Sequence, residues 1–174
     1  MNQLAENYWE EIQEILKRYP PDQKRSAVMP LLFLAQRKKN FVNDQSIREI
    51  SDILQVSPTD VASIAGFYSL FHQEPGGHYR IQVCTDLPCA LRGADGFLKA
   101  LSEYLSIEVG GTTSDGLFSL EEVKCLAACD HAPMFQLQGK GTIRYHQEQT
   151  IETAKTIIEG IRQSASLNME GELS

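Results

Sequence analysis

Cysteine is scarce in this chain of 174 residues, and all four cysteines fall in two short stretches, CTDLPC at 84–89 and CLAAC at 125–129. No apolar run approaches the roughly 20 residues needed to cross a bilayer. The beginning, MNQLAENYWEEIQEIL, lacks the basic start and apolar block of a secretory signal and the Arg-rich character of a transit peptide. We therefore expect a cytoplasmic protein in a reducing compartment, where structural disulfides are rare.

Positive charge is also in short supply. Lysine and arginine total 16 against 23 acidic residues, which gives a formal net charge of −7 and argues against nucleic-acid binding. The one basic cluster, QRKKN at 36–40, ends a helical pattern, where it is expected to favour the negative end of the helix dipole and to face water. The Gly-rich stretch VGGTTSDG at 109–116 lacks the spacing of a dinucleotide fingerprint, so the chain is predicted to bind neither NADH nor flavin by itself.

Helical periodicity dominates the first part of the chain, residues 1–73. The segments that carry it are 9–19, 26–38, 46–54 and 57–71. Ser46 is the expected N-cap of the third helix, with Glu49 completing a capping box. Ser57 is expected to cap the fourth helix, with Pro58 in its first turn. These residues predict a small four-helix module.

The pattern changes at EPGGH, 74–78, where we place a domain boundary. Tyr79, Ile81 and Val83 alternate as in a half-buried strand, and residues 117–124 fit a strand or a helical turn equally well. The other expected elements are a helix at 90–105, a hairpin around 139–141 and a helix at 148–162. Residues 74–163 thus predict a small domain that mixes helices and strands, followed by a polar, flexible tail at 164–174.

The two cysteine pairs each follow a likely strand end, with four residues between the members of the first pair and three between those of the second. Cysteines can be small core residues, but four in two tight pairs argue against that. A thioredoxin-type redox pair needs two intervening residues, which neither pair has. Four thiolates form a soft metal site that suits either zinc or an iron–sulfur cluster, and the spacing leaves both open.

The residues inside the two loops favour a cluster. TDLP and LAA offer backbone N–H groups, small side chains and apolar cover, without the charged filling of a zinc ribbon. Donated N–H groups and low polarity are also what tune an iron–sulfur centre.

These motifs carry a specific resemblance. CTDLPC with the helix that starts ALRGA, EEVKCLAACDHAP further on, and the segment GFYSLF at 66–71 resemble the thioredoxin-like 2Fe–2S ferredoxin family, and within it the 24 kDa-type (E chain) subunits of NADH:quinone oxidoreductase, respiratory complex I. The resemblance covers about residues 8–162. It implies an α+β protein with a four-helix module before a thioredoxin-like 2Fe–2S domain, and it makes 117–124 a strand.

The resemblance also implies the site. Cys84 and Cys89 would bind one iron of a 2Fe–2S cluster, and Cys125 and Cys129 the other. Ala127 stands where the family often has a glycine.

The function that follows from the resemblance is single-electron transfer. The chain would be a subunit of NADH:quinone oxidoreductase that exchanges electrons with the flavin of a larger partner, which would hold FMN and NADH. Further iron–sulfur subunits would be present, and the chain would be peripheral to the inner membrane through its partners. The isolated chain would have no catalytic residues and no turnover.

Several alternatives remain open. The cysteine pattern fits equally the diaphorase subunit of an NAD-linked hydrogenase or formate dehydrogenase. A free-standing ferredoxin and an interaction module stabilised by zinc on the four cysteines are further possibilities. Asp130 and His131 follow the last cysteine, where such residues commonly cap a turn before a proline such as Pro133.

Overall fold

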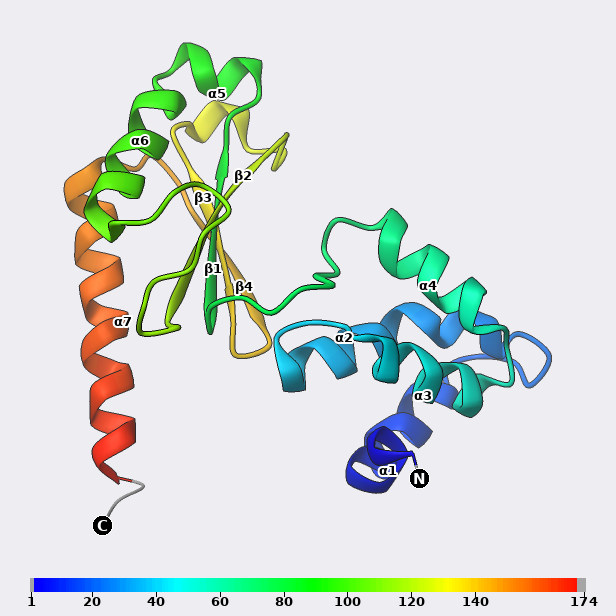
Figure 1. Ribbon diagram of the computed structural model, residues 1–174. Helices are drawn as coiled ribbons and strands as arrows, with labels where there is room; N and C mark the ends of the chain where they lie inside the picture. The colour runs from blue at the N-terminus through cyan, green and yellow to red at the C-terminus, as the bar shows by residue number, and fades with distance from the viewer. Residues whose placement is uncertain (1, 172–174) are drawn as a thin grey trace. The chain divides into compact units, whose positions relative to one another are not determined.

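The computed structural model describes residues 2–171 and divides the chain into two compact units, residues 1–75 and 76–174 (Figure 1). Each unit has its own apolar core. Among the described residues, no helix is both long and apolar enough to span a membrane.

The first unit is helical, as predicted. Its elements are α1 (Gln3–Leu16), the 3-10 helix η1 (Lys24–Ala27), α2 (Val28–Lys39), α3 (Asp44–Leu54) and α4 (Pro58–Phe67). Ser57 caps α4 and Pro58 occupies its first turn, which confirms that prediction. Fully buried aliphatic side chains from α1, α2, α3 and α4 meet in one core; they include Ile12, Leu31, Leu32, Ile50 and Val61.

The predicted cap of the third helix is wrong. α3 begins at Asp44, and its N-cap is Asn43, whose side chain accepts a hydrogen bond from the Ser46 N–H at 2.9 Å. Glu49 does not close a capping box on this helix. Its buried carboxylate accepts from the backbone N–H of Gln3 at 2.9 Å, so it satisfies a free donor at the start of α1.

The predicted basic cluster at 36–40 also needs a correction, because Gln36 is buried. Its side-chain NH₂ donates to the Leu70 carbonyl at 2.7 Å, and its side-chain oxygen accepts from the His72 N–H at 2.8 Å. Arg37, by contrast, is exposed and pairs with Glu11. Gln36 therefore fastens the segment that follows α4 to α2, using both ends of its amide.

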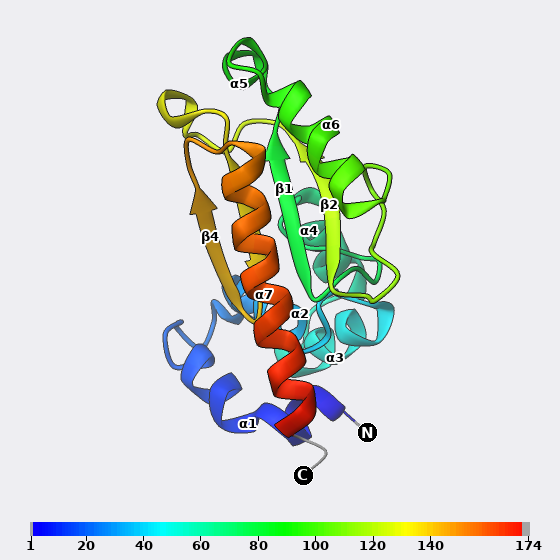
Figure 2. The same ribbon diagram turned by 90° about the vertical axis from the view of Figure 1, so that its left-hand side faces the viewer.

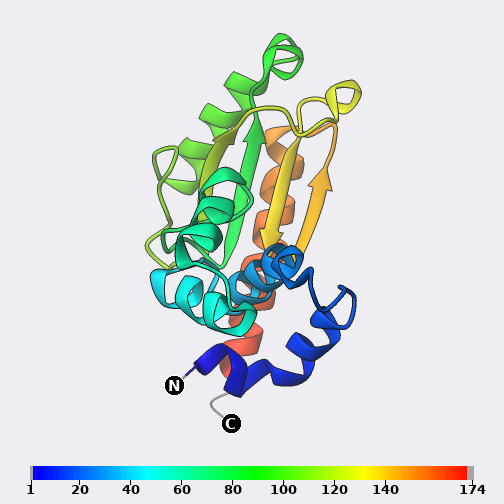
Figure 3. The ribbon, with the colours of Figure 1, turned by 90° about the vertical axis from the view of Figure 1, so that its right-hand side faces the viewer.

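The second unit is a four-stranded sheet with the helices α6 and α7 on one face. Its elements are β1 (Tyr79–Cys84), α5 (Leu87–Leu91), α6 (Ala94–Leu105), β2 (Phe118–Val123), the 3-10 helix η2 (Cys129–His131), β3 (Phe135–Gly139), β4 (Thr142–His146) and α7 (Ile151–Gly171). The strand order is β2-β1-β3-β4; β1 and β2 are parallel, and the other neighbours are antiparallel. Figures 1 and 2 show α6 and α7 covering the same face, and Figure 3 views the sheet from the other side.

The strand at 118–123 confirms the expectation from the family resemblance, and the hairpin lies where the sequence pattern places it. The predicted half-buried character of β1 is wrong, because its polar residues are buried as well. Ile81 and Val83 pack into the core shared with α6 and α7, whereas Arg80 and Gln82 lie on the opposite face and are also buried. Both bond to Glu121, at 2.6 and 2.8 Å, so that the buried polar groups have partners.

Two helix predictions differ from the structure. The segment at 90–105 is two helices, α5 and α6, separated at Gly93, whose φ of +91° is a left-handed conformation that favours glycine. The last helix begins at Ile151 and continues to Gly171, so residues 164–171 are helical where an irregular tail was expected. Residues 172–174 of that expected tail lie outside the described residues.

Candidate metal centre

The parallel pairing of β1 and β2 brings the two cysteine stretches together. Cys84, the last residue of β1, is in register with Val123, the last residue of β2. Because the carboxyl ends of parallel strands meet at one edge of a sheet, Cys125 emerges beside Cys84. Figures 1 to 3 show α5 and the loop around η2 at this same end of the sheet. Sheet topology thus gathers all four thiols.

The first pair is buried on regular structure. Cys84 ends β1 and is 2% exposed, and Cys89 lies within α5 and is 1% exposed. Asp86 is the N-cap of α5, its carboxylate accepting from the Leu87 N–H at 3.0 Å. Small and apolar side chains surround the pair: Ala94, Ala128, Ala132, Met134 and Leu126. They exclude water from the first two thiols.

The second pair lies on an irregular loop. Cys125 is exposed, and Cys129, in η2, is partly exposed. Cys125 and Ala127 both have left-handed backbones, with φ of +46° and +57°. These conformations turn successive backbone N–H groups in one direction, as in the nests that bind anions. A glycine at 127, the family's common residue, would adopt such a φ without strain.

The N–H groups of this loop point at the sulfur of the first cysteine. Cys84 Sγ accepts hydrogen bonds from the backbone N–H groups of Asp86, Leu126 and Cys125. Burial would raise the pKa of the Cys84 thiol, but these bonds and that from the Cys89 thiol outweigh it, so the pKa lies below its ordinary value. The site is built to hold a thiolate at Cys84.

Two other thiols, those of Cys89 and Cys129, resist ionisation beside it. Burial, then the hydrogen bond and charge of Cys84, raises the pKa of Cys89 to about 12. Burial, then the charges of Cys125 and Cys84, raises the pKa of Cys129. Four thiols in mutual electrostatic reach ionise together only when a cation offsets the repulsion, so this donor set fits a metal centre.

The arrangement is one of pairs. Within residues 2–171, no three histidine, cysteine or acidic side chains converge as the ligands of a single ion. A [2Fe–2S] cluster uses four cysteine thiolates shared between two irons, so it asks for two at each. The four cysteines, Cys84, Cys89, Cys125 and Cys129, match that requirement in number and chemical type.

Two side chains tie the cysteine loops to their surroundings. Arg92, just after α5, donates from Nη1 to the Asp130 carbonyl at 2.7 Å, across 38 positions of sequence. His131 lies 3.2 Å from Glu148 and 3.4 Å from Asp130. The Asp130 carboxylate therefore pairs with His131, and His131 connects the second loop to the segment that precedes α7.

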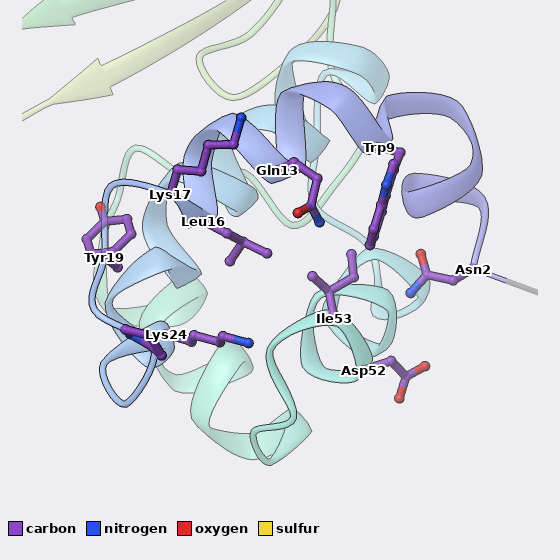
Figure 4. A pocket seen from close by; sticks show the side chains of 10 residues that line it. Asn2, Trp9, Gln13, Leu16, Lys17, Tyr19, Lys24, Asp52 and Ile53 are labelled. Carbon is purple, nitrogen blue, oxygen red and sulfur yellow. The ribbon is translucent and has the colours of Figure 1, made fainter.

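The helical unit contains a separate groove of about 780 Å³. Figure 4 shows Leu16 and Ile53 pointing into it, with Trp9 at one end. Trp9 is 55% exposed, and the Lys24 side chain extends into the groove. The groove combines an apolar floor with a positive charge, and no cysteine lines it.

Comparison with known proteins adds to this geometry. The family model described as thioredoxin-like [2Fe-2S] ferredoxin matches residues 12–162. The chain belongs to this family. Membership of the thioredoxin-like [2Fe-2S] ferredoxins covers both the helical unit and the sheet unit, and it supports a [2Fe–2S] cluster as the cofactor.

Curated relatives of this ferredoxin-family chain carry the name of one enzyme. It is 40% identical over 126 residues to NADH-quinone oxidoreductase subunit 2 of Thermus thermophilus, a match that covers 72% of this chain and 70% of the relative. It is 38% identical over 151 residues to the E subunit of NADH-quinone oxidoreductase from Rickettsia bellii, covering 86% and 88%. The resemblance to the E-type subunits is confirmed, and the chain is related to an oxidoreductase component.

The fold is also found in solved structures. An NAD+-reducing [NiFe]-hydrogenase in its air-oxidized state superposes with a TM-score of 0.64 at 22% identity, over 77% of this thioredoxin-like chain and 23% of the hydrogenase chain. At that identity the likeness shows the fold alone.

Sequence reasoning found the four cysteines and anticipated N–H donors in their loops, but it missed the conformation that aims those donors. The one available signal was the family's glycine at position 127, which marks a left-handed backbone. The link from Arg92 to Asp130 had no signal, because an exposed arginine gives no indication of which distant carbonyl it meets.

Proposed function

We propose that this chain is the electron-transfer subunit of an NADH:quinone oxidoreductase, carrying one [2Fe–2S] cluster on Cys84, Cys89, Cys125 and Cys129. The observation that carries this proposal is the cradle around Cys84: three backbone N–H groups, two of them from the second cysteine loop, converge on its sulfur. Such donors stabilise the negative charge of thiolates and set the potential of an iron–sulfur centre.

The residues around the thiols prepare the site. Cys84 is the more readily ionised of the two buried thiols. Ala94, Ala128 and Met134 shield it from water. A bound [2Fe–2S] cluster would supply one-electron chemistry. The chain would hold the cluster in a site of low polarity. The side of that site at Cys125 lies near the surface.

The electrons need a flavin partner. NADH gives up a hydride, which carries two electrons, so a flavin must divide them into single electrons before an iron–sulfur centre accepts them. We place FMN and NADH on a larger partner subunit, because the chain has no dinucleotide fingerprint and its relatives are named as subunits of NADH-quinone oxidoreductase. Further iron–sulfur subunits would complete an assembly peripheral to the inner membrane.

The helical unit would provide additional docking surface in this assembly. Among the aromatic residues near the N-terminus, Trp9 is exposed beside the groove, whereas Tyr8 packs against the helical core. Trp9 is therefore the better candidate.

The names of the relatives favour an NADH-quinone oxidoreductase as the host. The hydrogenase likeness, at 22% identity, supports only the shared fold. Purification of the native assembly decides between them: partners with quinone-reductase activity support the proposal, and a [NiFe] or formate-oxidising partner contradicts the choice of host.

The decisive experiment for the cofactor is anaerobic purification of the chain with iron, acid-labile sulfide and zinc assayed on one sample. About two irons and two sulfides per chain, with visible absorption bleached by dithionite, support the proposal. A colourless protein with one zinc per chain would replace it with the zinc-stabilised interaction module.

A second assay separates relay from catalysis. NADH added to the cluster-loaded, flavin-free chain is expected to leave the visible spectrum unchanged, whereas dithionite bleaches it. NADH oxidation by the pure chain would contradict a flavin site on a partner.

A further inference from the structure

The outer side of α5 is unusually apolar for an exposed helix. Leu87 is 68% exposed and Leu91 is 79% exposed, and they lie four residues apart, on the same face. Cys89 lies between them in sequence, two positions from each, and is buried. Two residues along a helix correspond to about 200° of rotation, so the leucines face outward directly behind a cysteine that faces inward.

The described part of the chain leaves both leucines uncovered. Truncating a side chain this exposed removes little buried area, so they contribute little to folding. Single exposed apolar residues are common, but a pair on one face directly behind a cysteine of the site, with exposed Pro88 between them, marks a contact surface.

Gly96, in the first turn of α6, is a second feature that the fold does not require. A methyl group added there would meet no atom within 4 Å in the described part of the chain, and its φ is not left-handed. Glycine in a helix interior costs about 1 kcal/mol relative to alanine. Gly160 in α7 is equally open, so an open glycine is not a site by itself; Gly96 is informative because it lies five positions after Leu91.

The charge around this surface is negative. Asp86 acts electrostatically on Cys89 and Cys129, and Asp86 and Asp95 both act on Lys124. Lys124 is paired with Glu122, and the single positive charge of Arg92, which bonds a neutral backbone carbonyl, leaves the two aspartates in excess. The complementary surface is therefore apolar with a basic rim.

We infer that the outer face of α5 with the start of α6, defined by Leu87, Leu91 and Gly96, is the surface on which the NADH-oxidising flavoprotein docks. This inference rests on the proposed function, which supplies the partner class. A helix is about 10 Å across, so a protein seated on the leucines is separated from Cys89 by one helix. Docking there places the electron donor close to the metal centre, and Gly96 allows close backbone approach.

The test uses the cluster-loaded chain and the FMN-loaded, NADH-oxidising subunit from the same organism. Calorimetry measures the Kd of their complex, and a second assay measures the rate at which NADH bleaches the cluster in the mixture. Leu87→Ala/Leu91→Ala is expected to raise Kd about ten-fold or more, as for buried anchor residues. Gly96→Gln is expected to raise it similarly, because the longer side chain has room in the free chain but not beneath a partner. Raising the salt concentration is expected to weaken binding.

Matched controls come from the same unit. Gly160→Gln makes the same change at another open helical glycine, and Val109→Ala shortens an exposed apolar side chain outside the proposed surface. Both are expected to leave Kd within two-fold of the unaltered chain. All variants should retain iron, sulfide and dithionite bleaching, which shows that the cofactor site is intact.

The outcomes are distinguishable. Unchanged Kd in both Leu87→Ala/Leu91→Ala and Gly96→Gln, with the cluster present, overturns the docking surface and leaves the proposed function standing. Self-association that the leucine variant abolishes assigns the surface to a second copy and also overturns the inference. An unaltered chain without iron refutes the proposed function itself, and an iron-loaded chain that does not bind the flavoprotein refutes its partner.

Discussion

The two cysteine pairs are held in different ways. The first lies on a strand end and a short helix and is buried, whereas the second lies on an irregular loop with two left-handed residues and is largely accessible. Regular hydrogen bonding positions the first pair, and backbone conformation positions the second. One half of the site is therefore part of the core. The other half is a strained loop whose N–H groups donate to Cys84 in the first half.

Serine substitution of one cysteine in each pair should give the largest difference between the two halves of the site. Cys89→Ser and Cys125→Ser are each expected to abolish stoichiometric iron and sulfide, because each removes one of the four proposed thiolate ligands. Their effects on the metal-free protein should differ. Cys89→Ser buries a hydroxyl in an apolar cluster and should cost about 1–3 kcal/mol, whereas Cys125→Ser is exposed and should stay within about 0.5 kcal/mol.

Iron and sulfide assays and urea unfolding of the metal-free variants provide the measurements. Equal stability of the two variants would contradict the view that only the first pair belongs to the core. Full iron content in either variant would remove that cysteine from the ligand set.

Cutting the link between the loops should affect the second pair selectively. Arg92→Ala removes the hydrogen bond to the Asp130 carbonyl and is expected to lower the free energy of unfolding by about 1 kcal/mol. It should also speed iron loss to a chelator, because the loop that carries Cys129 is less restrained. Arg144→Ala, at another exposed arginine, is the control; equal rates of iron loss in the two variants would show that the link has no such role.

Replacement of alanine by glycine should have opposite effects on stability in the loop of the second pair and in the helix of the first. Ala127→Gly relieves a left-handed alanine and is expected to stabilise the metal-free protein by up to about 1 kcal/mol. Ala90→Gly, in α5, should destabilise it by roughly 0.5–1 kcal/mol. Thermal unfolding of both variants checks this, and a loss of stability in Ala127→Gly would argue against backbone strain at that position.

The smallest expected effect is on the pH dependence of stability and comes from His146. Burial, with a smaller contribution from Arg144, lowers the pKa of His146 from its ordinary value of 6.5, and its Nε2 is buried without a hydrogen-bond partner among the described residues. Above that ordinary value both folded and unfolded states are neutral at this residue. Below that value the unfolded state takes up the proton more readily than the folded state. The free energy of unfolding therefore decreases as the pH is lowered.

His146→Phe should keep the stacking on Phe135, whose ring centroid lies 4.8 Å away, and remove part of this loss. Urea unfolding at about pH 7.5 and about pH 5.5 measures it. An unchanged difference between the two pH values would exclude His146 as a contributor.

The sequence was informative wherever a local pattern had a single solution. Ser57 with Pro58, the hairpin around Gly139 and the clustering of the cysteines are of this kind. It failed where several local solutions compete: Asn43 and Ser46 are both good caps, and the fold uses Asn43 while Glu49 serves a different helix. Tertiary contacts decide such cases, as they do for the buried Gln36, whose partners at 70 and 72 no local pattern reveals.

The same limit applies to the site. Residue types and spacing grouped the four thiols into one expected site, but only the family resemblance made 117–124 the strand before the second pair. They could not predict which backbone groups face Cys84, because that depends on φ at Cys125 and Ala127.

The register of β1 on β2 has a consequence for biogenesis. Cys84 and Val123 are paired across the two strands, so the thiols come together only when those strands have aligned, and a slip of one residue would turn the side chains of β2 to the opposite face. During synthesis the first pair must wait until the second has emerged and β2 has docked. Under the proposed function, insertion of iron and sulfide would follow alignment of the sheet, and the four thiols would be open to oxidants until then.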